Sequence, residues 1–268
     1  MNRILRVLSL AILFLAGRSG IAAAQDNARP VPPFKIFDNL YYVGLDSLGA
    51  YVLQTSGGLI LIDSLYPETK DYIPQAMQQL GLNPKDIKYV IVTHAHTDHT
   101  GGAKTIQDLT GARIGMAEAD WDMVARGGYT SSTGQPRVFD AIRRDLVIKD
   151  GDTVTLGDTV VKLYVTPGHT PGVTSLEFSV SDQGRKYKAF MFGGIGLNTV
   201  NGVKAVQQYI DSVRRVMAIP DVQVSLSNHP NARALQGLRD KKLDPEGFRT
   251  SMRSLLANAE KKLATEKN

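Results

Sequence analysis

Short apolar runs separated by glycine and polar residues mark the first third of the chain. Three of these runs have the β-branched and aromatic content that is typical of strands: 40–43, 50–53 and 59–62. Gly57 and Gly58 lie just before the last run and predict a hairpin turn. A continuous apolar run at 89–92 is typical of a strand buried on both faces. This pattern predicts a sheet that begins as a meander.

The rest of the chain alternates between helical and strand patterns. Helices are expected in four stretches: 68–80, a stretch ending near Leu109, 116–126 and 203–218. Further strands are expected within 146–165 and at 176–180, 188–192 and 222–226. A last helix should begin with Asp244 as its N-cap and Pro245 in its first turn. This order predicts two sheets packed together with helices outside.

The first residues have the layout of a secretory signal peptide. A basic start is followed by an apolar run of 11 residues, Val7–Gly17, and then by a small-residue cleavage site at Ala22–Ala24. The run is too short to span a bilayer comfortably. Arg18 also permits an uncleaved anchor, which is the alternative. We expect a signal peptide at 1–24 and a periplasmic or secreted domain at 25–268, with no stable membrane insertion after cleavage.

Composition and charge indicate a soluble globular protein and limit which partners and metal ligands are expected. The chain has 268 residues, 43% hydrophobic and 21% charged, which is ordinary for a soluble globular protein. Its net charge is +5, but without residues 1–24 it keeps 28 of its 31 basic residues against 26 acidic ones, a net charge of +2. Because there is no basic block, nucleic acid is not expected as a partner. With no cysteine, a metal site must use His, Asp or Glu.

All five histidines follow a predicted buried strand. The densest segment places His94, His96, Asp98 and His99 within six residues. Residues two apart in a loop can face one way, so His94 and His96 can bind one metal ion while Asp98 and His99 turn toward a second. Two such ions can share a bridging water. A polar surface loop is the alternative, and the density of these residues argues against it.

Glycine and proline shape the segments around the cluster. Gly101 and Gly102 are expected to let the backbone turn sharply into the next helix. Two Pro-Gly pairs frame His169, and His229 precedes a proline. Each of these two histidines alone is weak evidence for a site. A site for two zinc ions needs about six protein ligands, and His169 and His229 complete that number.

The order His-x-His-x-Asp-His, then a Gly-His loop and a late His, resembles the metallo-β-lactamase superfamily over about Leu40 to Pro230. The resemblance implies an αβ/βα four-layer sandwich and two Zn²⁺ ions. It implies two ligand sets: His94, His96 and His169 for the first zinc, and Asp98, His99 and His229 for the second. A second set without cysteine is most similar to class B, subclass 3 of the β-lactamases.

Four other side chains have two interpretations each. Asp63 ends a strand that resembles the family's early strand, so it would either orient a ligand through a hydrogen bond or serve as a turn residue. Trp121, Tyr129 and Tyr66 would either line a substrate cleft or belong partly to the core. The sequence alone does not decide between these interpretations.

The resemblance also implies a mechanism. The metals would lower the pKa of a shared water toward about 7, and the metal-bound hydroxide would attack a carbonyl carbon. Asp98 is the expected catalytic side chain, because it would hold the second zinc and accept a hydrogen bond from the hydroxide. A zinc-binding protein without catalysis is the alternative from another class, and it would need closed coordination of both ions.

The expected substrate depends on an absent carboxylate. Family members that hydrolyse lactones or glutathione thioesters carry an Asp between the two metals, whereas residues 193–196 at the matching position hold no carboxylate. Ile195 also lacks the polar atom that many β-lactamases place there. Asn198, Thr199 or Lys204 would then meet the substrate's carboxylate. We expect opening of the β-lactam ring of antibiotics, with hydrolysis of a lactone, ester or thioester as the alternative.

Overall fold

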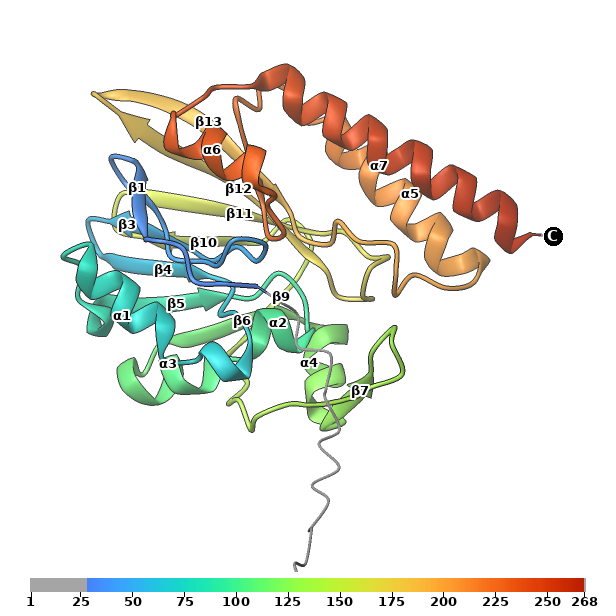
Figure 1. Ribbon diagram of the computed structural model, residues 1–268, viewed down its shortest axis with the longest axis horizontal. Helices are drawn as coiled ribbons and strands as arrows, with labels where there is room; N and C mark the ends of the chain where they lie inside the picture. The colour runs from blue at the N-terminus through green and yellow to red at the C-terminus, as the bar shows by residue number, and fades with distance from the viewer. Residues whose placement is uncertain (1–27, 268) are drawn as a thin grey trace, which may run out of the picture.

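Four layers make up the fold in the computed structural model, which describes residues 28–267. Two β-sheets lie face to face, and helices cover the outer face of each sheet (Figure 1). This arrangement confirms the αβ/βα sandwich that the sequence predicts. The expected signal peptide at 1–24 and the expected start at Gln25 lie outside the described residues.

The first sheet has seven strands in the order β1-β2-β3-β4-β5-β6-β9. Their bounds are β1 Phe34–Phe37, β2 Leu40–Tyr42, β3 Tyr51–Thr55, β4 Gly58–Ile62, β5 Ile87–Ile91, β6 Arg113–Ala117 and β9 Leu146–Ile148. The first four strands form an antiparallel meander, in which β2, β3 and β4 were predicted and β1 was not, and β4, β5, β6 and β9 run parallel. The β3–β4 turn pairs Thr55 with Gly58, so Ser56 and Gly57 form the loop, one residue before the predicted turn.

The second sheet has five strands in the order β10-β11-β12-β13-β14. Their bounds are β10 Thr153–Leu156, β11 Thr159–Val165, β12 Thr174–Asp182, β13 Arg185–Phe192 and β14 Val224–Ser227. The predicted hairpin of β12 and β13 is confirmed, and only β13 and β14 run parallel among these strands. A separate two-stranded hairpin, β7 Gly128–Thr130 and β8 Pro136–Val138, stands apart from both sheets.

Two groups of helices flank the sheets. The α-helices are α1 Tyr72–Gln79, α2 Thr97–Thr100, α3 Ala103–Thr110, α4 Glu118–Ala125, α5 Val203–Met217, α6 Ala232–Arg239 and α7 Pro245–Glu266, with short 3-10 turns η1 Pro67–Thr69 and η2 Pro84–Asp86. Helices α1, α3 and α4 cover the first sheet, and α5 and α7 cover the second (Figure 1). The start of α7 is as predicted, because the Asp244 side chain accepts a hydrogen bond from the backbone N–H of Gly247.

Two predicted helices are wrong in their extent. The predicted helix 68–80 is divided into η1 and α1, because Pro74 has no N–H and is tolerated only in the first turn of a helix. The predicted helix 116–126 begins later, at Glu118, because residues 113–117 pair with β5 as strand β6. These corrections leave the order of the layers unchanged.

Three apolar clusters hold the layers together. One lies between the two sheets, and one lies between each sheet and its helices. The middle cluster takes alternate residues of both sheets, such as Ile60 and Ile62 of β4 against Leu163 and Leu176 of the second sheet. Among residues 28–267, no helix is long and apolar enough to cross a membrane.

Candidate metal centre

The six predicted ligands gather where strands of the two sheets end. Beyond β5, His94 and His96 lie in a short loop, and Asp98 and His99 lie in the single turn of α2. Two further strand ends supply the remaining histidines: His169 follows β11 and His229 follows β14. The backbone N–H of Thr174 donates to the carbonyl of Thr93 at 2.7 Å, which joins the two sheets at this point.

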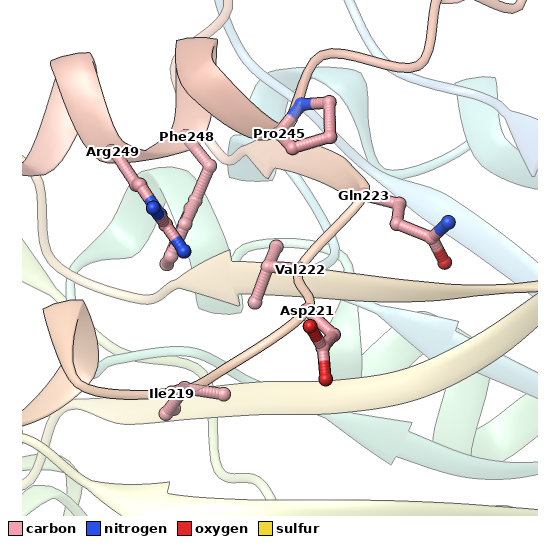
Figure 2. Close-up of a pocket in the computed structure, with 7 residues that line it drawn as sticks. All are labelled: Ile219, Asp221, Val222, Gln223, Pro245, Phe248 and Arg249. Atoms are coloured by element: carbon pink, nitrogen blue, oxygen red, sulfur yellow. The ribbon is translucent and has the colours of Figure 1, made fainter.

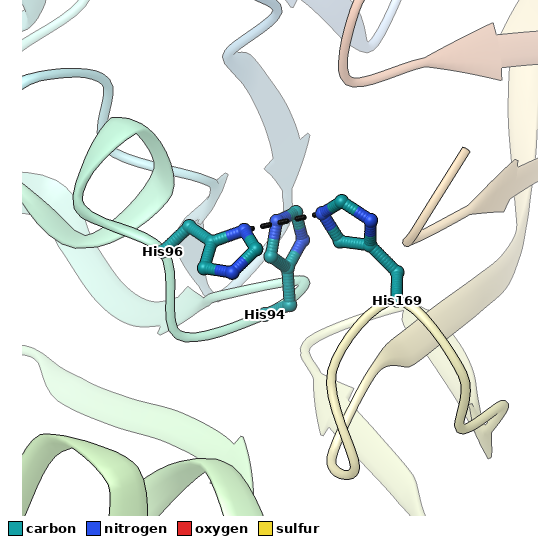
Figure 3. Close-up of side chains that lie close together, drawn as sticks. All are labelled: His94, His96 and His169. Carbon is teal, nitrogen blue, oxygen red and sulfur yellow. Dashed lines mark hydrogen bonds between the residues drawn. The ribbon is translucent and has the colours of Figure 1, made fainter. Parts of the chain in front are cut away.

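The first group consists of three imidazole rings, those of His94, His96 and His169. Figure 3 shows them converging from two loops, with Nε2 of His169 3.1 Å from Nδ1 of His96. All three residues are buried, and their ligand atoms lie within 4.8 Å of one another. Nε2 of His94 is buried without a hydrogen-bond partner among the described residues. An imidazole nitrogen left in this way is suited to a cation.

The second group consists of Asp98, His99 and His229. Nε2 of His99 lies 3.1 Å from Nε2 of His229 and 3.3 Å from Oδ2 of Asp98. The His229 ring completes the triangle at 3.6 Å from the same carboxylate oxygen. The side chain of His99 is fully buried, whereas that of His229 is 36% exposed. This group therefore opens toward solvent on one side.

Nδ1 of three rings, those of His94, His169 and His99, faces away from the site and lies beside a hydrogen-bond acceptor. Nδ1 of His94 donates to the carbonyl of Gly193 at 2.9 Å, and Nδ1 of His169 donates to that of Gly196 at 2.8 Å. For His99, Nδ1 lies 2.9 Å from Oδ2 of Asp63. These acceptors fix the orientation of each ring, so Nε2 of all three rings faces into the site.

Asp63 lies at the end of a strand, and its carboxylate also orients the ring of His99. Its carboxylate accepts from the backbone N–H of Thr93 at 2.7 Å and from the Thr93 hydroxyl at 2.9 Å, besides the contact with His99. Its backbone lies in the left-handed region, with φ of 60°. That conformation is costly for a residue with a Cβ, and the three hydrogen bonds hold it in place.

Two glycines, Gly101 and Gly102, allow two backbone segments to lie close together at the site. Gly101 and Gly102 both have right-handed helical φ values, of −59° and −90°, so the predicted sharp turn needs no unusual conformation. A Cβ at Gly101 would lie 2.1 Å from the backbone nitrogen of Pro67, and one at Gly102 would lie 2.5 Å from the carbonyl oxygen of Ser64. The two glycines therefore let the turn after β4 pack directly on α2.

Burial keeps the first group uncharged. Removal from water, together with the neighbouring imidazoles, lowers the pKa of His94 well below its usual range and lowers that of His96 to about 3. Burial also lowers the pKa of His169 to about 4. At neutral pH all three rings are neutral, which is the form that binds a cation.

Carboxylates give the second group the opposite character. Burial alone would lower the pKa of His99, but Asp98 and Asp63 outweigh it and raise the pKa to about 10. Burial would raise the pKa of Asp98, and His99 reverses this so that the pKa lies well below its usual value. In the metal-free protein His99 is therefore an imidazolium between two carboxylates.

Both groups have the chemistry and spacing of metal sites. Tetrahedral ligands about 2.0–2.1 Å from a zinc ion lie about 3.3 Å from one another. The separations between donor atoms given above, 3.1 Å in the first group and 3.1–3.6 Å in the second, match this spacing. The unpartnered Nε2 of His94 supports the same conclusion. The residues present fit two metal ions.

A cleft of about 900 Å³ lies over the two groups. His96, Asp98, His169 and His229 line its floor, and Tyr66 and Tyr129 also line it, which is one of the two interpretations that the sequence left open. Trp121 does not: it is 2% exposed and its indole N–H donates to the carbonyl of Leu146 at 2.8 Å. Asn198 and Thr199 also line the cleft, and the Thr199 hydroxyl donates to the carbonyl of His169 at 3.1 Å. Lys204 is exposed and lies outside the lining.

A second pocket of about 400 Å³ lies elsewhere, between the α5–β14 connection and the start of α7 (Figure 2). Apolar side chains of Val222 and Phe248 line it together with Asp221 and Arg249. It shares no lining residue with the cleft and contains none of the five histidines. The candidate site is therefore the cleft.

Comparison with known proteins agrees with this site. The family model described as "Metallo-beta-lactamase superfamily" matches residues 49–182. The chain belongs to the metallo-β-lactamase superfamily. Its structure superposes on BJP-1, a subclass B3 metallo-β-lactamase of Bradyrhizobium japonicum, with a TM-score of 0.79, 34% identity and coverage of 89% of this chain and 96% of the other.

Other superfamily members have names that describe different activities. Native FEZ-1 metallo-β-lactamase from Legionella gormanii superposes with a TM-score of 0.81 and 28% identity, covering 90% of this chain and 98% of the other. A hydroxyacylglutathione hydrolase of Cereibacter sphaeroides is 26% identical over 60% of this chain and 54% of its own. The chain spans about half the length of the curated relatives that it matches.

In this protein the hairpin of β7 and β8 brings two side chains to the cleft. The ring of Tyr129 stacks on that of His96 with centroids 4.9 Å apart, and its hydroxyl accepts from the backbone N–H of Thr97 at 3.2 Å. Arg137, directly opposite Tyr129 in the hairpin, lines the same cleft. Sequence reasoning missed Arg137, because an isolated arginine in a strand of three residues has no distinguishing pattern.

Proposed function

We propose that this protein is a zinc-dependent hydrolase that opens the β-lactam ring of antibiotics. The segment after β13 carries this proposal. Gly193 and Gly196 offer only backbone carbonyls to the outer nitrogens of two histidines, and Ile195 places an apolar side chain in the cleft. No carboxylate from this segment lies between the two groups, whereas family members that act on lactones or glutathione thioesters have an Asp there.

The side chains of the site have distinct roles in this proposal. When bound, two zinc ions would supply an activated water and would polarise the substrate carbonyl. His94, His96 and His169 would bind as neutral donors, and the carbonyls that accept from Nδ1 of His94 and Nδ1 of His169 keep those two rings fixed through the reaction. Asp98, ionised and 19% exposed, binds on the cleft side and accepts a hydrogen bond from the attacking water.

Hydrolysis adds one water across the amide bond of the ring. A C–O bond forms at the carbonyl carbon and the C–N bond breaks, and the proton of the water passes to the leaving nitrogen. Because Asp98 holds a hydrogen bond to that water, its carboxylate lies on the path of the proton. The chain needs no covalent nucleophile in this scheme.

Arg137 suits the substrate's carboxylate, which β-lactam antibiotics carry. It is the only lysine or arginine among the described residues that line the cleft. Its guanidinium forms no ion pair within residues 28–267, so it is available to a ligand. Asn198 and Thr199, which line the same cleft, would add hydrogen bonds. We therefore assign the charge contact to Arg137 in place of Lys204.

A substrate comparison tests the proposal. Catalytic efficiency of the zinc-loaded protein would be measured on a penicillin, a cephalosporin, a carbapenem, an acyl-homoserine lactone and a glutathione thioester. We expect turnover of at least one β-lactam to exceed that of the lactone and the thioester. Much faster turnover of the lactone or thioester than of every β-lactam would overturn the substrate assignment.

We also propose that the protein acts in the periplasm or is secreted. The basis is the sequence of residues 1–24, with its apolar run and cleavage site. Mass spectrometry of exported protein should show a chain that begins at Gln25. An intact Met1 on the exported protein would contradict cleavage.

A further inference from the structure

A buried carboxylate outside the two groups contacts the loops that carry the first group. Asp120 lies in α4 and is 0% exposed. Its Oδ2 accepts from the backbone N–H of Ala95 and from the Thr170 hydroxyl, both at 2.8 Å. Its Oδ1 accepts from the backbone N–H of Gly172, also at 2.8 Å. Three donors thus converge on one side chain.

The three donors come from two loops that belong to different sheets. Ala95 lies between two histidines of the first group, in the loop after β5. Thr170 and Gly172 follow His169 in the loop that joins β11 to β12. Because β5 and β11 belong to the seven-stranded and five-stranded sheets respectively, Asp120 connects the two sheets at the site.

The contact with the second loop depends on close approach. A Cβ at Gly172 would lie 2.6 Å from Oδ1 of Asp120, so a side chain there would separate the loop from the helix. Burial raises the pKa of Asp120 to about 6, and the three hydrogen bonds counteract this effect. A buried carboxylate is costly unless its oxygens are hydrogen-bonded, and here both are.

We infer that Asp120 is a positioning residue that holds the His94–His96 loop and the His169 loop at the spacing a metal ion in the first group requires. The second group has a different support, because His99 is oriented by Asp63. Loss of Asp120 should therefore weaken the first metal site and leave the second nearly intact. The inference rests on the metal binding proposed above.

The test measures metal affinity at each site separately. Asp120→Asn keeps the size of the side chain but offers one carbonyl oxygen, and it turns an N–H₂ group toward a donor. The Asp120→Asn substitution would be made in two backgrounds. His229→Ala disrupts the second group and leaves the first intact, and His169→Ala disrupts the first group and leaves the second intact. Zinc affinity is read by competition with a chromophoric chelator, and ligand geometry by the visible spectrum of the cobalt-substituted protein.

We expect a loss of roughly 10–100-fold in affinity at the first group and less than roughly threefold at the second. Asp145→Asn is the matched control. Asp145 also accepts from a backbone N–H, that of Ile114, and from the Gln107 side chain, but it touches neither histidine loop. Equal losses in both backgrounds, or a loss no larger than in Asp145→Asn, would overturn the inference.

Two less disruptive substitutions at Thr170 test the inference if Asp120→Asn does not fold. Thr170→Val removes the hydroxyl that donates to Asp120, and Thr170→Ser keeps it. Weaker zinc binding in Thr170→Val, with Thr170→Ser close to the unmodified protein, supports the role, and equal affinities contradict it. Unmodified protein that binds no metal would refute the proposed function itself, which separates the two failures.

Discussion

His99 and His169 belong to one cluster but hold protons differently, because their rings meet different partners. His99 lies between the carboxylates of Asp63 and Asp98, so its ring keeps a proton in the metal-free protein. Nδ1 of His169 meets the carbonyl of Gly196, and burial keeps that ring neutral. A metal entering the second group must displace a proton, whereas one entering the first group need not.

The buried neutral histidines predict an acid-sensitive metal-free protein. His96 and His169 have pKa values of about 3 and about 4 when folded and ordinary values near 6.5 when unfolded. The unfolded chain therefore binds more protons below pH 6.5, and stability falls as the pH falls. At pH 5 each histidine costs about 2 kcal/mol relative to pH 7. Urea denaturation of chelator-treated protein at both pH values measures the loss.

His99 offsets only a small part of this loss. Its folded pKa is raised to about 10, so its contribution is fully present well below pH 6.5 and is lost progressively as the pH rises from 6.5 toward 10. The double variant His96→Asn with His169→Asn should show a smaller change between pH 7 and pH 5. Equal stability of the unmodified metal-free protein at the two pH values would disprove the expected sign.

Arg137→Ala should weaken binding of substrates that carry a carboxylate. Loss of a charge-assisted hydrogen bond of about 1.5 kcal/mol raises KM roughly tenfold, with a smaller effect on kcat. Steady-state kinetics on a penicillin and on a neutral ester or lactone would measure the difference between the two substrate types. Zinc content should not change, because Arg137 contacts neither group of ligands.

Lys204→Ala is the matched control, since Lys204 is exposed outside the cleft. Its KM values should equal those of the unmodified protein. A larger effect on KM from Lys204→Ala than from Arg137→Ala would reverse the assignment of the carboxylate contact.

At the scale of elements, the turn after β4 and helix α2 act as one unit. The backbone N–H of Ser64 and the Ser64 hydroxyl both donate to the carbonyl of His99, at 2.9 Å and 2.7 Å. The backbone N–H groups of Gly101 and Gly102 donate back to the carbonyls of Leu65 and Ser64. The position of the second group therefore depends on how closely these two segments pack.

Gly101→Ala should disturb this packing. Its Cβ would overlap the backbone of Pro67, which cannot move aside as a flexible side chain can, so we expect a loss of about 2–3 kcal/mol of stability. Displacement of α2 should also weaken metal binding at the second group. Chemical denaturation and zinc titration measure the two effects.

Gly237→Ala in α6 provides the contrast. A Cβ at Gly237 would meet nothing within 4 Å, and alanine favours a helix by roughly 0.5–1 kcal/mol over glycine. This variant should therefore be as stable as the unmodified protein or more so. Similar destabilisation by both substitutions would show that close packing at Gly101 is not the cause.

The sequence predicts those elements whose burial leaves a periodic pattern. The buried run of β5, the amphipathic α5 and the capped α7 all have one. Helix α6 has only Leu235 and Leu238 as buried residues, and the β7–β8 hairpin is mostly polar and partly exposed, so both were missed. Short elements supported by tertiary contacts leave too few apolar positions to form a period.

The same distinction applies to the site. All six predicted ligands come together, because imidazole and carboxylate in dense spacing are chemically distinctive. Asp120 could not be predicted, since Ala95 and Gly172 contact it through backbone N–H groups, which every residue except proline has. The side-chain chemistry of a site is visible in a sequence, whereas its backbone support appears only in the fold.

At the scale of the whole molecule, each group takes ligands from both sheets. The first sheet supplies two donors of the first group and two of the second, and the other sheet completes them with His169 and His229. A metal bound in either group therefore links the two sheets. Binding to the folded state alone must raise the stability of the whole domain.

Chelation should reveal this link. Zinc at about 1,000 times its dissociation constant adds about 4 kcal/mol per site, so removing it should lower Tm by on the order of 10 °C. Elemental analysis should give close to two zinc ions in loaded protein and close to one in His169→Ala. An unchanged Tm after chelation, or well under one metal in loaded protein, would contradict the two-site arrangement.

The spread of the ligands along the chain also sets an order of events in folding. His96 meets a partner 73 positions later, whereas His99 meets one 130 positions later. Closing the longer loop has the greater entropic cost, and its last residue follows β14, which pairs only after β13 is in place. The ligands of the first site can thus meet once β13 and the segment with Gly193 and Gly196 are in place, before β14 and the residues after it have folded. The second site is complete only when nearly the whole chain has folded, so its occupancy reports the end of folding.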